Sequence, residues 1–268
     1  MPGTHDTGAH GPGPDDPGDH VLASRLAVEA GEVLVSLRHR LGREGVDRSA
    51  LGTEGDRRAH ALIVDSLAAS RPRDPVLSEE GVHDTVRLGE RRVWVVDPLD
   101  GTREFSEGRS DWAVHVALVV DHEPVVGAVA LPGDGLVLDT SRPPVVPPAG
   151  ERPLRLVVSR SRPPELARSV AERLGAELVA MGSAGAKAMA VLRGEADIYL
   201  HAGGQYEWDS AAPVAVALTA GLHASRLDGS PLRYNQPDAY LPDLLVCRTE
   251  LAAKFLELCE ELGAGSDR

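Results

Sequence analysis

The sequence predicts a layered α/β protein, and three patterns along its 268 residues support this fold class. Several segments carry apolar residues three or four positions apart, the spacing that gives a helix one buried face. Other segments are short, apolar and rich in β-branched residues, as buried strands are. After residue 153 these two patterns alternate, which favours helices packed on a sheet. Aromatic residues make up only 3% of the chain, so the core must consist mainly of Val, Leu and Ala.

Two helices and a sheet are predicted in the first part of the chain. The expected helices span residues 21–41 and Gly55–Ala69, with a loop at 42–54 between them and Asp56 in the first turn of the second helix. The expected strands are Val76–Leu77, Arg92–Val96, Ala113–Val120, Pro124–Leu131 and Leu136–Asp139. Asp121–Glu123 is a short polar turn that makes a hairpin of the third and fourth strands.

A boundary follows at residues 142–153, which contain five prolines. We therefore expect an N-terminal α+β half at residues 19–150 and a C-terminal α/β half at residues 151–268. The strands expected in the second half are Leu154–Val158, Glu177–Ala180, Ala196–Leu200 and Leu244–Cys247, and the helices are Pro164–Leu174, Ser183–Leu192, Asp209–Ala220 and Thr249–Leu262. Residues 1–18 are rich in Pro, Gly and Asp and lack the basic start and apolar stretch of a signal peptide, so we expect a disordered tail.

Charge and cysteine content restrict the partners and the compartment. The net charge of −13 argues against a nucleic-acid polymer or an anionic membrane surface as partner. No apolar run approaches the ~20 residues that span a bilayer. The two cysteines, Cys247 and Cys259, form no Cys-x-x-Cys pair, which is typical of a protein of the reducing cytoplasm. The ten histidines show no metal-ligand spacing, so we expect surface or packing roles for them.

The segment from Trp94 to Thr102 carries the strongest chemical signal. A hydrophobic strand delivers Asp97 to its carboxyl end, where active sites of α/β sheets gather. A proline follows and turns the chain, so that Asp97 and Asp100 converge. Gly101 permits close approach of an anion to the backbone, and carboxylate and carbonyl oxygens suit Mg²⁺ better than zinc. A solvated Asp-Gly turn is the simpler alternative, but the whole segment is far more specific than that dipeptide.

Two further acidic segments are placed to complete such a site. Glu79 and Glu80 follow a short apolar strand, and Asp209 lies at a helix start within Tyr206-Glu207-Trp208-Asp209-Ser210. Taken singly, Asp209 is explained by helix capping and the glutamates by surface charge. Together with the Asp97 turn, the segments supply four carboxylates that can bridge two or three Mg²⁺ ions.

The three motifs, in this order, resemble the signatures of the inositol monophosphatase superfamily of Mg²⁺-dependent, Li⁺-sensitive phosphatases, over roughly residues 20–262. The resemblance implies a layered αβαβα sandwich of the inositol monophosphatase and sugar phosphatase type. It also implies that Glu79, Asp97 and the Leu99 carbonyl hold a first metal, that Asp97, Asp100 and Asp209 hold a second, and that Glu79 helps to place a third through water.

The resemblance further implies roles in catalysis. The amides of Gly101 and Thr102 receive the phosphate. The segment Thr53-Glu54-Gly55-Asp56 matches the family's Thr-x-x-Asp, without the lysine that many relatives carry upstream. Asp56 and Thr102 then orient and deprotonate the attacking water, with Glu79 as the third catalytic group.

Other segments resemble the CysQ-type 3′-phosphoadenosine 5′-phosphate phosphatases. These are Val76–Glu80, Ser159-Arg160-Ser161, Gly182–Lys187 with one extra residue before the lysine, and Pro231–Asn235. The resemblance implies that Ser159, Arg160, Ser183 and Lys187 bind the substrate's second phosphate and that Asp209 also contacts substrate. Helix capping explains Ser183 equally well, and solvation explains the two cations.

The function that follows is Mg²⁺-dependent hydrolysis of 3′-phosphoadenosine 5′-phosphate to AMP and phosphate, in sulfate assimilation. Inositol 1-phosphate and fructose 1,6-bisphosphate are the alternative substrates, alone or in a dual specificity. A metal-binding protein that has lost catalysis is a further alternative, although neither the carboxylates nor Thr102 are missing. The resemblance also implies two to three Mg²⁺ per site, Li⁺ inhibition and a homodimer.

Overall fold

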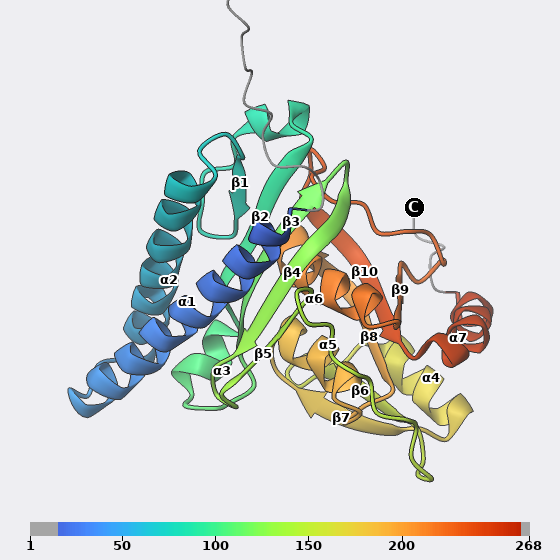
Figure 1. The fold of residues 1–268 in the computed structure, drawn as a ribbon. Coiled ribbons are helices and arrows are strands. Elements are labelled where there is room, and N and C mark those ends of the chain that lie inside the picture. Colours follow the sequence, from blue (N-terminus) through green and yellow to red (C-terminus); the bar gives the residue numbers. More distant parts are fainter. Residues whose placement is uncertain (1–15, 264–268) are drawn as a thin grey trace, which may run out of the picture.

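The computed structural model describes residues 16–263. In this part of the chain two five-stranded sheets alternate with three layers of helices (Figure 1). Helices α1 and α2 cover the outer face of the first sheet, α5 and α6 lie between the sheets, and α4 and α7 cover the second sheet. The αβαβα order predicted from the sequence is confirmed. The helices are α1 Pro17–Arg43, α2 Arg48–Ser70, α3 Thr102–Ser106, α4 Glu165–Leu174, α5 Ala184–Leu192, α6 Glu207–Thr219 and α7 Thr249–Glu261, with a 3-10 helix η1 at Thr85–Gly89.

The first sheet has the order β1-β2-β3-β4-β5, and only its β1–β2 pair is parallel. Its strands are β1 Val76–Ser78, β2 Arg92–Asp100, β3 Ala113–Val120, β4 Glu123–Leu131 and β5 Leu136–Asp139. Asp97 pairs with His115 and Asp100 with Ala113, so β2 uses one residue more than β3 between these pairs. Such an extra residue bends a strand and re-aims its side chains. The irregularity at Pro98 and Leu99 therefore sets the directions of the two aspartates.

The second sheet has the order β7-β6-β8-β10-β9. Its strands are β6 Arg155–Ser159, β7 Glu177–Met181, β8 Ile198–Tyr206, β9 His223–Ser225 and β10 Tyr240–Cys247. Strand β6 is parallel to β7 and β8, so its carboxyl end and that of β8 face the same edge. Strand β8 continues past the predicted end at Leu200 and leads directly into α6.

The helical layer between the sheets joins both parts of the chain in one core. Val95 of β2, Met189 of α5 and Val246 of β10 belong to the same buried cluster. Helix α6 lies close to β4 because Gly127 has no Cβ, which would stand 2.6 Å from the carbonyl oxygen of Ala212. This close contact fixes the start of α6, and Asp209 with it. The proposed halves at 19–150 and 151–268 remain a prediction, although residues 143–154 between the sheets form neither helix nor strand.

The predicted loop at 42–54 is wrong, because α2 already begins at Arg48 and carries Asp56 in its third turn. Gly52 lies in this predicted loop but is helical for a packing reason, and Gly55, the predicted first residue of the second helix, is packed in the same way. A Cβ on Gly52 would stand 2.8 Å from Thr102 Cγ2, and a Cβ on Gly55 would stand 3.1 Å from Phe105 Cε1. The glycines thus let α2 approach α3 closely.

Helix α1 begins at Pro17, so Pro17 and Gly18 of the predicted tail at 1–18 are helical. Residues 1–15 of that tail lie outside the described residues. No helix in residues 16–263 combines the length and the apolar character that a bilayer crossing requires.

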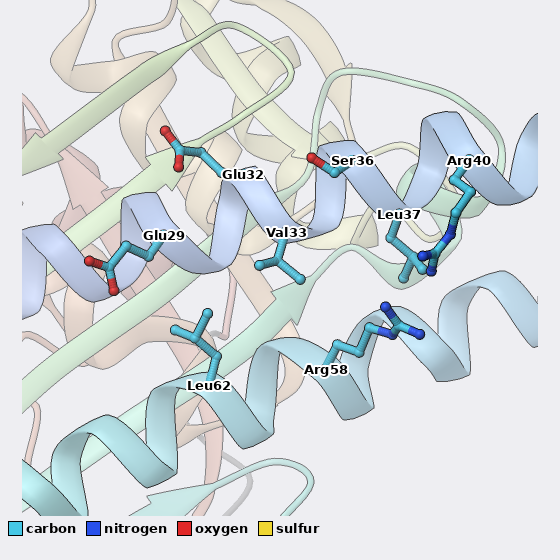
Figure 2. Close-up of a pocket in the computed structure, with 8 residues that line it drawn as sticks. All are labelled: Glu29, Glu32, Val33, Ser36, Leu37, Arg40, Arg58 and Leu62. Carbon is cyan, nitrogen blue, oxygen red and sulfur yellow. The ribbon is translucent and has the colours of Figure 1, made fainter.

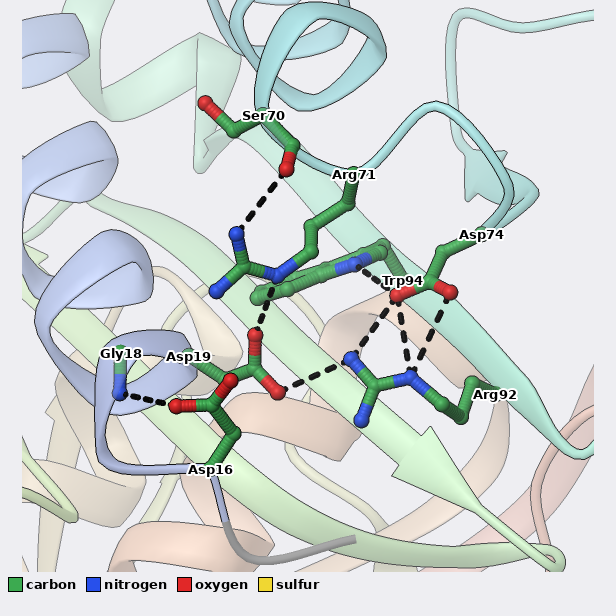
Figure 3. A network of polar contacts seen from close by, with 8 residues as sticks. All are labelled: Asp16, Gly18, Asp19, Ser70, Arg71, Asp74, Arg92 and Trp94. Atoms are coloured by element: carbon green, nitrogen blue, oxygen red, sulfur yellow. Dashed lines mark hydrogen bonds and ion pairs between the residues drawn. The ribbon is translucent and has the colours of Figure 1, made fainter. Parts of the chain in front are cut away.

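A buried ionic network holds the start of α1 against the rest of the first half (Figure 3). The Asp19 carboxylate is fully buried and accepts hydrogen bonds from Arg71 at 2.6 Å and from Arg92 at 2.9 Å. Asp74 accepts a second bond from Arg92 at 2.8 Å and one from the Trp94 indole at 3.2 Å. Because Arg71 follows α2 and Arg92 begins β2, one aspartate ties three elements together.

Candidate metal and active site

Three aspartates from distant parts of the chain converge at one end of the first sheet. Asp97 and Asp100 come from β2, and Asp209 comes from the first turn of α6. One carboxylate oxygen from each lies within 4.8 Å of the others. Glu79, directly after β1, is near enough to Asp97, Asp100 and Asp209 for these groups to shift its pKa. The four predicted ligands are therefore close to one another.

The electrostatics of this carboxylate cluster (Glu79, Asp97, Asp100 and Asp209) fit divalent cations. Burial raises the pKa of Asp97 well above its ordinary value, and the charges of the other three members add to the shift. Burial and the charge of Asp209 raise the pKa of Glu79 to about 7, and burial and the charge of Asp100 raise that of Asp209 to about 6. None of these three carboxylates forms an ion pair with Lys or Arg in the described residues. Hard oxygen donors with uncompensated charge are the ligand set that Mg²⁺ prefers.

Asp100 differs from the other members because α5 surrounds it with donors. Its carboxylate accepts hydrogen bonds from the amides of Ala184 at 3.1 Å and Gly185 at 2.7 Å and from the Ser183 hydroxyl. Burial opposes ionisation, but the hydrogen bond and charge of His115, with smaller effects of Lys187 and Ser183, lower the pKa of Asp100 to about 2. Asp100 is therefore a candidate metal ligand, and it also binds the N-terminus of α5.

His115 is a functional residue that the sequence did not reveal. Its ring is fully buried, with Nε2 3.3 Å from Asp100 Oδ2 and Nδ1 3.0 Å from the Trp208 carbonyl oxygen. Nδ1 is thus within hydrogen-bond distance of the Trp208 carbonyl oxygen, and Nε2 lies within ion-pair distance of Asp100 without a hydrogen bond in residues 16–263. A Cβ on Gly185 would stand 2.0 Å from Nε2, so only glycine leaves room for the ring. His115 lies opposite Asp97 in the pairing of β2 with β3, and this pairing would have indicated its place near the cluster. Sequence patterns do not fix the register of the two strands, so the pairing could not be predicted.

Asp56 and Thr102 lie together beside the carboxylate cluster. Burial, with the charges of Glu80 and Glu79, raises the pKa of Asp56 to about 8, and a hydrogen bond with Thr102 opposes this rise. The Thr102 hydroxyl also lies 3.1 Å from the Leu99 carbonyl oxygen. Its single proton can go to only one of these two acceptors, and among the residues that the structure describes the buried Asp56 Oδ1 atom has no hydrogen-bond partner.

A cavity of about 330 Å³ opens next to this pair. Gly101 precedes Thr102 with a φ of 87°, a left-handed conformation that favours glycine. A Cβ at this position would stand 3.2 Å from Ser183 and 3.3 Å from Trp112, so the close packing of the turn also requires a residue without a side chain. The residues that line the cavity are Arg48, Ser49, Gly52, Thr53, Asp56, Thr102, Arg103, Ser106 and Glu107.

The predicted second-phosphate contacts have partners inside the protein. Arg160 donates to Glu104 at 2.7 Å and to Glu107 at 2.9 Å. Lys187 is buried, and its ammonium donates to the carbonyl oxygens of Gly182 at 3.1 Å and Ser183 at 2.6 Å. The Ser159 hydroxyl accepts from the Arg162 amide at 3.3 Å.

Arg162 is a cation that the sequence analysis did not single out. It is exposed just after β6, at the edge toward which β8 also runs. Burial lowers the pKa of His201, and the charges of Lys187 and Arg162 add to this effect, so the three groups are close. Arg162 forms no ion pair among residues 16–263.

A groove of about 620 Å³ between α1 and α2 contains none of the predicted site residues (Figure 2). Its walls are Glu29, Glu32, Val33, Ser36, Leu37, Arg40, Arg58 and Leu62. The candidate site is thus the carboxylate cluster with its adjoining cavity and not this groove.

Comparisons with known proteins agree with the site. Residues 19–263 match the model of the inositol monophosphatase family. Over 257 residues the chain is 51% identical to the 3′-phosphoadenosine 5′-phosphate phosphatase of Mycobacterium leprae, which covers 91% of this chain and 94% of that protein. Over 200 residues it is 32% identical to the 3′(2′),5′-bisphosphate nucleotidase CysQ of Escherichia coli K12, with 70% of this chain and 81% of that protein covered.

A solved structure shows the same architecture. The crystal structure of CysQ from Bacteroides thetaiotaomicron matches with a TM-score of 0.74 and 29% identity, over 87% of this chain and 98% of that one. The family consists of metal-dependent phosphatases, as the carboxylate cluster requires. Fold, site and sequence agree, and the chain belongs to the inositol monophosphatase family.

Proposed function

We propose that this protein is a Mg²⁺-dependent phosphomonoesterase that hydrolyses 3′-phosphoadenosine 5′-phosphate to AMP and phosphate. The observation that carries the proposal is the carboxylate cluster beside the Asp56–Thr102 pair, which combines metal ligands with a base for water. The names of the relatives at 51% and 32% identity support the substrate. They also support a role in sulfate assimilation, where this nucleotide is a by-product.

Mg²⁺ bound by Glu79, Asp97, Asp100, Asp209 and the Leu99 carbonyl supplies positive charge that stabilises the phosphoryl group and lowers the pKa of a bound water. The protein's own groups do the rest. Asp56 accepts a proton through the Thr102 hydroxyl, which lies between it and the Leu99 carbonyl. The amides at Gly101 and Thr102 receive the phosphate oxygens.

The second phosphate of the substrate needs cations near the same edge. Lys187 contributes through its charge from a buried position, and its ammonium lies against the helix start that also holds Asp100. Arg160 is neutralised by two glutamates, so its contact with substrate requires exchange of one of these partners. The exposed Arg162 has no ion pair in residues 16–263 and could bind a phosphate without giving one up.

Asp209→Asn tests the reaction. The variant keeps the side-chain shape and removes one ligand charge, so we expect phosphate release from 3′-phosphoadenosine 5′-phosphate to fall at least ~100-fold. Asp65→Asn, an exposed change on α2, is the matched control. Wild-type turnover by folded Asp209→Asn would refute the scheme, and activity that survives EDTA would refute the metal requirement.

Substrate choice is tested with wild-type protein. The ratio of kcat/KM for 3′-phosphoadenosine 5′-phosphate over inositol 1-phosphate and over fructose 1,6-bisphosphate should exceed one by a wide margin. A ratio below one would transfer the proposal to the alternative ester.

We also propose two to three Mg²⁺ per site, inhibition by Li⁺, a cytoplasmic location and a homodimer. Li⁺ added to the same assay tests inhibition. Light scattering behind a sizing column tests whether the particle mass is twice that of one chain.

A further inference from the structure

The exposed aromatic side chains of this protein gather at a single place. The chain has nine Phe, Trp and Tyr residues, and all lie in the described part. Seven of them are buried, and the other two, Tyr206 and Tyr240, are 48% and 47% exposed. Their ring centroids are 6.1 Å apart in an edge-to-face arrangement. With so few aromatic residues available, two adjacent exposed rings form a distinct surface feature.

This feature adjoins the carboxylate cluster. The Tyr206 amide donates to Asp209 Oδ2 at 2.7 Å, so the Tyr206 ring lies within one side-chain length of a metal ligand. Tyr206 is the last residue of β8 and Asp209 is in the first turn of α6. A nucleotide phosphate and its base are likewise separated by a single ribose. A base on the Tyr206 ring can therefore belong to the same nucleotide as an ester phosphate at the carboxylate cluster.

The Tyr206 ring is held in a fixed orientation. It stacks on Trp208 with ring centroids 4.9 Å apart and planes 8° from parallel, and Trp208 itself contacts the His83 ring at 5.3 Å. Since one face packs on Trp208, the exposed area of the ring lies on the outer side. A ring that is already immobilised loses little conformational freedom when a ligand stacks on it.

Two glycines open the space beside the ring. Gly203 and Gly204 have φ values of 122° and 92°, which other residues rarely adopt. A Cβ on Gly204 would collide with the Tyr240 ring at 2.5 Å, whereas Gly203 has nothing within 4 Å. Gly204 thus lets the Tyr240 ring pack against the backbone, and the position of Gly203 borders open space.

We propose that the outer face of Tyr206 is the stacking surface for the purine base of the substrate, with Tyr240 at its edge. This inference rests on the proposed function, which supplies a purine nucleotide. Aromatic rings stack on bases through their π-faces, whereas inositol and sugar phosphates offer no such face. Tyr206 therefore makes the site selective for nucleotides without taking part in the reaction.

The test compares two ligands that differ only by the base, AMP and ribose 5-phosphate. Calorimetry on the Mg²⁺-loaded protein gives the Kd of each for wild type, Tyr206→Ala, Tyr206→Phe and the control Leu136→Ala, a similarly exposed apolar side chain of β5. We expect Tyr206→Ala to weaken the binding of AMP, raising its Kd roughly 5- to 150-fold. Ribose 5-phosphate and inorganic phosphate should bind with unchanged Kd, and Tyr206→Phe should bind AMP as the wild type does.

Three outcomes would overturn the inference. One is an unchanged Kd for AMP in folded Tyr206→Ala. Another is equal weakening of AMP, ribose 5-phosphate and phosphate, which would indicate damage to the phosphate site. A third is a changed particle mass with unchanged AMP affinity, which would assign the rings to a subunit contact. Failure of the proposed function differs from all three, because wild-type protein would then release no phosphate from 3′-phosphoadenosine 5′-phosphate.

Discussion

Protons and metal ions compete for the carboxylate cluster, and the raised pKa values set the size of this competition. In the metal-free site the pKa of Glu79 is about 7 and that of Asp209 about 6, both raised by burial and by neighbouring charge. A group with a raised pKa binds a proton at higher pH and must release it before a cation binds. We therefore predict that the apparent affinity for Mg²⁺ falls as the pH is lowered from 8 to 6.

The magnitude follows from the two values taken as separate protonations. At pH 8 both groups are almost fully ionised, whereas at pH 6 protonation weakens binding about 11-fold at Glu79 and about 2-fold at Asp209. The combined loss is about 20-fold. Glu79→Gln removes the larger contribution, so its affinity should be lower at every pH but should change only about 2-fold over the same range.

Calorimetric titration with Mg²⁺ at both pH values, in buffers of different ionisation enthalpy, measures the affinity and the protons released. Asp65→Asn, a carboxylate on the exposed face of α2, should retain the full pH dependence. Equal affinities at pH 8 and pH 6 in wild type, or a Glu79→Gln variant as pH-dependent as wild type, would refute the reasoning.

Three further predictions concern stability and are checked by thermal unfolding. His115→Ala leaves the Trp208 carbonyl without its hydrogen-bond partner and Asp100 without its neighbour at 3.3 Å, which should lower the free energy of unfolding by about 3 kcal/mol. Gly185→Ala should lower it by about 1–3 kcal/mol because the new Cβ displaces the same ring. A wild-type Tm in either variant would contradict the packing of this ring against Asp100 and Gly185. Asp19→Asn leaves Arg71 without its carboxylate partner, which should lower the free energy of unfolding by about 3–5 kcal/mol. At about 2–4 °C for each kcal/mol, the Tm should fall by about 6–20 °C. A fall in Tm smaller than that of Asp65→Asn would show that the stability does not depend on this ionic network. Burial opposes ionisation of Asp197, but hydrogen bonds from Arg152, the Arg155 amide and Arg248 lower its pKa below 3.8. The ionised carboxylate therefore stabilises the fold above pH 3.8, and this stabilisation is lost as the pH falls through the pKa of the folded state. The Tm difference between wild type and Asp197→Asn should shrink over that pH range, and a constant difference would disprove the stabilising role of the Asp197 charge.

Local patterns predicted the chemistry because the motif residues are close in sequence. Asp97 and Asp100 belong to one strand end, and the bulge between them is encoded by Pro98 and its neighbours. Asp209 was predicted at a helix start and does occupy the first turn of α6. Apolar periodicity and strand length predicted a layered α/β fold, whereas the αβαβα order of its layers was implied by the family resemblance.

Long-range packing explains what the patterns missed. Gly52 is a poor helix former and was predicted in a loop, yet α2 includes it because the absence of a Cβ allows close contact with Thr102. His115 looked like any strand residue until the β2–β3 register placed it against Asp100. The predicted contacts of Arg160 and Lys187 with substrate stay predictions; the Arg160 partner Glu104 lies 56 residues away in the sequence, so no local pattern indicates that ion pair.

The attachment of Asp100 to α5 has a consequence for the timing of synthesis. The donors at Ser183, Ala184 and Gly185 are made 83 to 85 residues after Asp100, and Asp209 later still. At about 5–20 residues per second, a ribosome needs roughly 5–20 s between Asp100 and Asp209. Throughout that interval the nascent chain carries an incomplete ligand set. If the proposed function holds, a polypeptide interrupted before Asp209 lacks one of the four carboxylates and should not hydrolyse phosphate esters.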